Sequence, residues 1–232
     1  VVWDISPSGF MVEHQQHYTG LTHITRGRLI ANSLNPFAGD IRIDGGSELL
    51  LNGSGPTVPY EGTISGAGDV AVGTHNTAIW NADHTFSGRT GIGREGTLTL
   101  GTGGNTGSIV GDVRFDAPFG GFSGTLEINR ANDYLYDGAI SGEGNLIKNG
   151  AGNYILSADH SMTGNATVNA GGMLVNGAMP TIPGPIPFQV SPEVQVPIKT
   201  STSPKPSSSM RATWNWLIRL SPSTPKAGRP AP

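Results

Sequence analysis

The chain has 232 residues, of which 35 are Gly, 13% are charged and none is Cys, and its formal net charge is −3. The lack of Cys excludes disulfides and zinc–thiolate sites, and an acidic, Gly-rich chain without a clustered basic face excludes a role in nucleic-acid binding. No apolar run approaches the roughly 20 residues of a membrane-spanning helix. The composition favours many short strands joined by tight turns.

The chain divides into two segments of different composition. Residues 1–179 carry 16 acidic and 8 basic side chains, a balance of −8, and 33 of the 35 Gly. Residues 180–232 carry 1 acidic and 6 basic side chains, a balance of +5, and 12 of the 17 Pro. We therefore predict a folded body over residues 1–179, followed by a Pro/Ser-rich, low-complexity and disordered tail over residues 180–232.

An internal repeat organises the body. After a partial copy at residues 18–24, a second copy starts with residues 60–70 (YEGTISGAGDV) and a third with residues 136–146 (YDGAISGEGNL), at an offset of 76 residues without a gap. The match continues through residues 82–84 and 158–160, which both read ADH. A repeated unit that cannot bury its own apolar side chains must stack on its neighbours.

Apolar residues alternate with polar ones within each copy, which is the period of a strand with one buried face. In the second copy the alternating residues are Val70, Val72, Ala78, Trp80, Phe86, Thr90 and Ile92. Stacked coils of roughly 20–25 residues would give about eight coils over the body. We predict that Trp80 is buried. Phe86 and Met162, which share a repeat position, should point inward at equivalent places in different coils.

At this point the sequence resembles a known family. Residues 137–152 (DGAISGEGNLIKNGAG) resemble the autotransporter-associated β-strand repeat, which reads like G-x-I-S-G-x-G-x-L-x-K-x-G-x-G. Residues 162–171 (MTGNATVNAG) look like its continuation, Y-T-G-x-T-x-V-x-x-G. The resemblance covers most of residues 9–177. It implies an all-β, pertactin-like passenger: a right-handed parallel β-helix (β-solenoid) followed here by an irregular Pro-rich tail.

The resemblance also implies a location at the cell surface or outer membrane of a Gram-negative bacterium, or outside the cell. Such passengers usually carry a signal peptide and a C-terminal β-barrel translocator. Neither is found in these 232 residues, so we expect a fragment.

Six histidines raise the question of a metal site. His14, His17 and His23 are close in sequence, but they differ in strand parity, and zinc ligands must converge from defined elements, usually with Cys or a carboxylate. His84 and His160 recur at one repeat position, each after an Asp, which favours a structural role at a turn. We predict no metal site.

Two Gly-rich stretches resemble cofactor or calcium motifs. Residues 91–96 (GIGREG) fit the dinucleotide pattern G-x-G-x-x-G, but that fingerprint requires a helix opening after it, and here the repeat predicts a solenoid turn. Residues 45–49 (GGSEL) are loosely like a calcium-binding nonapeptide, yet the Asp expected in each unit does not recur. We predict no cofactor.

Asp112, Asp116, Glu127 and Asp133 form the best supply of carboxylates for catalysis. Solenoid enzymes that cleave polysaccharides align two or three carboxylates across neighbouring coils. The spacing here does not align them, and exposed strand faces account for them. Neither G-D-S-G nor G-x-S-x-G occurs. We predict no catalytic residue; a carboxylate cluster in one groove would instead favour a lyase or hydrolase.

The tail abandons the repeat. Residues 199–209 are typical of a solvated linker, and residues 214–220 (WNWLIRL) form an apolar island, aggregation-prone or partner-binding. The tail is either a genuine Pro-rich linker or an out-of-frame translation starting near residue 180. The sudden loss of Gly and the reversal of charge favour the second explanation.

These observations predict a structural or adhesive passenger fragment that is not an enzyme. Its expected partners are ligands on host or neighbouring cells, and open strand edges would allow self-association. The alternatives are a polysaccharide-active β-helix enzyme and a non-functional truncated gene product. The least regular stretch, residues 117–123, is expected to be a loop between coils.

Overall fold

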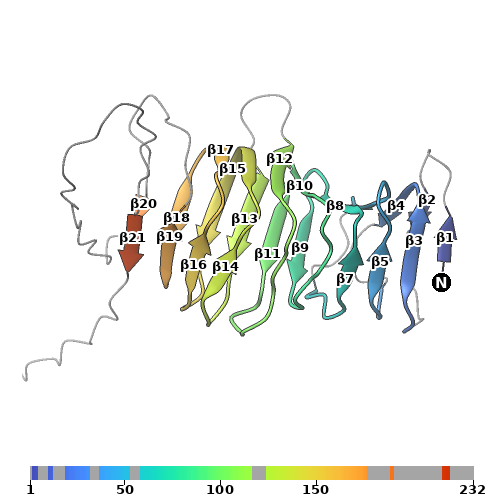
Figure 1. Cartoon of the computed structure of the whole chain (residues 1–232), viewed down its shortest axis with the longest axis horizontal. Helices are drawn as coiled ribbons and strands as arrows, with labels where there is room; N and C mark the ends of the chain where they lie inside the picture. The colour runs from blue at the N-terminus through green and yellow to red at the C-terminus, as the bar shows by residue number, and fades with distance from the viewer. Residues whose placement is uncertain are drawn as a thin grey trace, which may run out of the picture.

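In the computed structural model, the described part of the chain is all-β and contains no helix. The backbone is described for residues 2–4, 10–12, 19–31, 37–52, 58–116, 124–176, 189–190 and 216–219, and the side chains within residues 19–31, 37–52, 58–116 and 124–176. Strands of successive coils stand side by side along the long axis of the body (Figure 1). The predicted parallel β-solenoid is confirmed.

The strands of successive coils line up in three rows. The first row holds β1 (Val2–Asp4), β3 (Thr22–Arg26), β5 (Ile41–Ile43) and β7 (Ile64–Gly66), and further along β14 (Tyr134–Tyr136), β16 (Asn153–Leu156) and β19 (Gly172–Val175). The second row holds β2 (Phe10–Val12), β4 (Arg28–Ala31), β6 (Glu48–Leu51), β8 (Asp69–Val72), β10 (Thr90–Gly93), β12 (Val113–Asp116), the start of β15 (Ile140–Lys148) and β17 (Ser161–Thr163). The third row holds β9 (Thr77–Trp80), β11 (Thr97–Leu100), β13 (Gly124–Ile128), the end of β15, β18 (Ala166–Val168) and β20 (Gln189–Val190).

Segments outside the named strands complete the first row between β7 and β14. The amides of Thr85 and Ser87 donate to the carbonyls of Ile64 and Gly66, and Asp83 forms a parallel bridge with Ser108. Residues 83–87 and 108–111 therefore lie on the same side of the solenoid as β7 and β14.

The core consists of the inward residues that alternation predicts. Trp80, Phe86 and Leu156 are fully buried and Met162 is 5% exposed. Leu156 stacks on Tyr136 of the preceding coil, and the buried residues form one continuous core along the body. The inward assignment of these residues is confirmed.

The 76-residue repeat is longer than a whole number of coils. Along the second row, Val70 pairs with Thr90, Thr90 with Val113 and Val113 with Ile140, which are steps of 20, 23 and 27 residues and 70 in total. The counterpart of Val70 in the third copy is Leu146, six residues further, which pairs with Leu126 in the third row. Successive copies of the repeat therefore occupy different sides of the solenoid.

This rotation corrects one prediction. Phe86 lies in the first row, where the amide of Ser87 bonds to Gly66, whereas Met162 in β17 pairs with Gly142 in the second row. Both side chains point inward, but from different faces. The prediction assumed that the offset between copies equals a whole number of coils, whereas the offset spans three coils and about one further strand.

The two glycines of the Ile-Ser-Gly-x-Gly motif have separate steric reasons. Gly66 has φ of 101°, and a Cβ there would lie 2.1 Å from the carbonyl oxygen of Ile43. A Cβ on Gly144, the counterpart of Gly68, would lie 2.2 Å from Cγ of Phe115. The first Gly permits a left-handed backbone at the corner between two rows, and the second leaves room for a core side chain of the preceding coil.

Among the described residues beyond residue 179 are two short strands. β20 pairs in parallel with β18, and β21 (Trp216–Arg219), within the apolar island, pairs antiparallel with β19. The proposed linker at residues 199–209, the loop at residues 117–123, and His14 and His17 lie outside the described residues. The disordered tail stays a prediction.

Candidate binding surface

The outward side of the first row changes character along the solenoid. Its central positions are His23, Arg42, Ser65 and Thr85 in the earlier coils, and then Val110, Leu135, Ile155 and Leu174. Leu135 pairs with Ile155 and Ile155 with Leu174, so these side chains stack on one side of β14, β16 and β19. We call Val110, Leu135, Ile155 and Leu174 the aliphatic column.

Val110 belongs to the coil just before Leu135. The amide of Ala131 donates to the carbonyl of Gly104, and the amide of Val113 to Ala139, so the two segments run side by side. Between these bonds, two tyrosine hydroxyls of β14 reach the earlier coil. The Tyr134 hydroxyl bonds to both the N–H and the carbonyl of Ile109, and the Tyr136 hydroxyl to the carbonyl of Gly111.

The aliphatic column is open to solvent in its first two members. Val110 is 57% exposed and Leu135 is 56% exposed, while Ile155 and Leu174 are partly buried. A single exposed Leu needs no explanation. A column of aliphatic side chains at one outward position in four consecutive coils is different, because a solvated strand face normally presents polar residues there.

Acidic side chains flank the aliphatic column. The segments 108–112, 133–137, 153–157 and 172–176 contain Asp112, Asp133 and Asp137 but no Lys or Arg. All three carboxylates are exposed and are held by the next coil: Asp112 accepts from the amide of Ala139 at 2.8 Å, Asp133 from the amide of Asn153 at 2.8 Å, and Asp137 from the hydroxyl of Ser157. The surface is apolar along its centre and negative at its margins.

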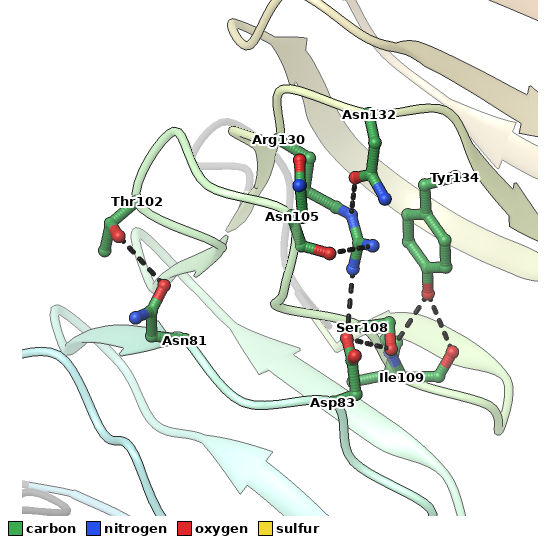
Figure 2. Close-up of polar contacts among 9 residues, drawn as sticks. All are labelled: Asn81, Asp83, Thr102, Asn105, Ser108, Ile109, Arg130, Asn132 and Tyr134. Carbon is green, nitrogen blue, oxygen red and sulfur yellow. Dashed lines mark hydrogen bonds and ion pairs between the residues drawn. The ribbon is translucent and has the colours of Figure 1, made fainter.

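A Gly-rich loop, residues 101–107, borders this surface. Hydrogen bonds from Arg130 hold this loop in place (Figure 2). The Arg130 guanidinium, in a residue only 6% exposed, donates to the carbonyl of Asn105 at 2.6 Å and to Asp83 Oδ1 at 3.1 Å. Its Cζ lies 4.9 Å from the centroid of the Tyr134 ring, a cation–π contact.

Other bonds hold the same loop. Thr102 Oγ1 donates to Asn81 Oδ1 at 2.8 Å, and the amide of Gly103 donates to the carbonyl of Asn129 at 2.8 Å. Gly101 and Gly107 have φ of 82° and 95°, which only Gly adopts without strain. Residues 102–106 are exposed, so the loop is a fixed projection beside the aliphatic column.

The recurring histidines are structural, as predicted from their position. Nδ1 of His84 accepts the amide of Ile64 at 3.0 Å, and Nδ1 of His160 accepts the amide of Ile140 at 3.1 Å. Burial lowers the pKa of His84 to about 4, against an opposing effect of Asp83, and burial also lowers the pKa of His160. His23, by contrast, is partly buried and contacts Asp44 at 2.9 Å.

The four carboxylates considered for catalysis do not converge. Asp116 lies in the second row beside Arg114 at 2.9 Å, Glu127 lies in the third row and accepts from Asn149, and Asp112 and Asp133 flank the aliphatic column. Within the described residues, no group of three or more His, Asp or Glu side chains is arranged to hold a metal ion.

The two Gly-rich motifs are solenoid turns. Residues 91–96 run from β10 through a turn into β11, with no helix opening, and residues 45–47 form the turn between β5 and β6. Among the described residues there is also no helix with the length and hydropathy to cross a membrane.

Lys148 is a buried cation that the alternation rule did not anticipate. It occupies the inward position that Val72 has in the preceding copy, and its Nζ donates to the carbonyls of Gly150 and Ala170. Burial lowers its pKa to about 8, with Asp133 opposing the shift. Its ammonium group satisfies carbonyls at a corner of the coil and is not available for chemistry outside.

Sequence reasoning missed the aliphatic column and the Arg130 contacts. A signal for the column is present in the sequence: Tyr134–Tyr136 and Gly172–Val175 contain continuous apolar runs in place of strict alternation. No comparable signal exists for Arg130, because its partners come from segments 25 and 47 residues away.

The chain is similar to one curated protein of stated function, and the comparison agrees with the fold. It is 31% identical over 183 residues, 69% of this chain, to the adhesin BmaC autotransporter of Brucella suis biovar 1 (strain 1330). The chain spans about 5% of the length of that relative. No family model and no solved structure matches.

The fold defines the class of structure: a parallel β-solenoid built of stacked coils. With the homology to an autotransporter adhesin, the chain is identified as a fragment of an autotransporter passenger, as the repeat motif predicted.

Proposed function

We propose that this chain is a structural and adhesive part of a passenger on the surface of a Gram-negative bacterium, and that it turns over no substrate. The stacked coils provide a rigid support, and the aliphatic column with the adjoining loop at residues 101–107 provides the contact surface. The observation that carries the proposal is the aliphatic column. Three consecutive coils stack Leu135, Ile155 and Leu174 outward on one face, and Val110 lies in the coil before them; Val110 and Leu135 are more than half exposed, and such patches mark interaction sites.

The test compares beads coated with the chain and beads coated with albumin on epithelial monolayers and on bacterial lawns. We expect the coated beads to adhere more, and Val110→Gln with Leu135→Gln to reduce adhesion. Thr85→Gln is the matched control, since Thr85 has the same outward position in the polar part of the row. Adhesion equal to albumin beads on every surface would reject the adhesive role.

The non-enzymatic part of the proposal has a separate readout. The chain should release no product from a panel of pectins, glucans and peptides, because its carboxylates are engaged on different faces. Turnover that disappears in Asp116→Asn or Asp133→Asn, with the circular dichroism spectrum intact, would contradict it and favour a polysaccharide lyase or hydrolase.

A further inference from the structure

The spacing of the aliphatic column matches an α-helix better than a β-strand. Neighbouring strands are about 4.8 Å apart, so Leu135, Ile155 and Leu174 span about 9.6 Å. Side chains at i, i+3 and i+7 of a helix span about 10.5 Å at 1.5 Å per residue. Side chains at i, i+2 and i+4 of a strand span about 13 Å. A helix laid along the solenoid can therefore contact all three side chains and matches their spacing more closely than a strand does.

The negative charges at the margins of the aliphatic column favour a positively charged partner. Asp133 and Asp137 lie two residues on either side of Leu135, about 7 Å along the strand. An amphipathic helix carries polar side chains on both sides of its apolar row. Lys and Arg in those positions would extend over the aliphatic column and reach the carboxylates.

We propose that the aliphatic column, with Asp112, Asp133 and Asp137, binds a basic amphipathic helix of a partner protein, two to three turns long and parallel to the solenoid axis. This inference rests on the adhesive function proposed above and specifies its ligand. Val110 lies in the coil before Leu135 and gives the helix a further apolar contact toward the loop at residues 101–107.

Other occupants fit less well. A second copy of the chain would bring the same three Asp against each other, and no helix exists in the described residues of the chain to fill the column. The apolar island of the tail contributes β21, which pairs with the edge of β19 as a strand.

The experiment uses the full chain and three labelled peptides. The probe is an Ala-based peptide of 15 residues with Leu at i, i+3, i+7 and i+10 and Lys at the flanking positions. A second peptide has the same composition with Leu and Lys alternating, and a third has Glu in place of Lys. Fluorescence anisotropy should show that, of the three peptides, only the probe binds the chain saturably. This binding should weaken as the salt concentration rises.

Two substitutions locate the binding. Leu135→Gln should weaken binding of the probe at least tenfold, and Asp133→Asn with Asp137→Asn should remove most of the salt dependence. Thr85→Gln should bind as the unsubstituted chain does.

Equal binding of all three peptides, or an unchanged affinity in Leu135→Gln, would overturn the inference. So would concentration-dependent dimers of the unsubstituted chain that are lost in Leu135→Gln, since the occupant would then be a second copy. If coated beads adhere through Leu135 but the probe does not bind, the helical ligand is wrong and the adhesive function stands.

Discussion

At the scale of single residues, the inside of the solenoid contains polar groups that replace missing backbone partners. His84 accepts a backbone amide through Nδ1 while its ring packs edge-on against Trp80, 5.0 Å between centroids. Lys148 and the tyrosines of β14 have a comparable role, but they donate hydrogen bonds to backbone carbonyls. Such residues could not be placed inward from the sequence, because charged and titratable types are assigned to water by default.

His84 makes stability depend on pH in a defined window. Its pKa is about 4 in the folded chain, and an unfolded His has about 6.5. The folded state therefore binds fewer protons between these values. The contribution of the neutral ring is fully present above pH 6.5 and is lost as pH falls towards 4.

We expect this loss to reach about 3 kcal/mol. His84→Gln keeps an acceptor for the amide of Ile64 but does not titrate. Urea unfolding at pH 7, 5.5 and 4 should show the unsubstituted chain losing more stability than His84→Gln. Parallel curves for the two proteins would refute the assignment.

At the scale of strands, alternation predicted the buried positions well and the outward positions less well. Trp80, Phe86 and Leu156 were identified because a period of two leaves them no other face. Ile155 and Leu174 were not, because alternation says only that they point outward and does not say what they contact. The 27-residue step from Val113 to Ile140 depends on loop length, which no periodicity encodes, so the rotation of the repeat was also missed.

A strand-scale prediction tests the parity directly. Leu156→Asp should cost about 4 kcal/mol or more, because an unpaired carboxylate would replace a fully buried side chain stacked between Tyr136 and Val175. Asn165→Asp, at an exposed turn, should cost about 0.5 kcal/mol or less. Urea midpoints that coincide for the two variants would show the inward assignment to be wrong.

At the scale of the whole molecule, the coils are held only by their neighbours, so the ends of the stack decide how it associates. β1 and β2 are terminal in their strand orders, each with a partner on one side, while β21 lies against β19 at the other end. A terminal parallel strand presents unpaired amides and carbonyls that another chain can pair with. We therefore predict that the 232-residue chain self-associates at its N-terminal end.

Sedimentation velocity over a hundredfold range of concentration should show this association. Fusing a polar capping coil before residue 1 should abolish it, since the cap pairs with the strand edges and offers charged side chains outward. A Gly/Ser extension of equal length is the control, because it adds bulk without pairing and should leave the association in place. If both extensions suppress association equally, steric bulk is responsible and the strand edges are not the contact. If the chain stays monomeric at every concentration, the edges are already protected and the end-to-end mode is excluded.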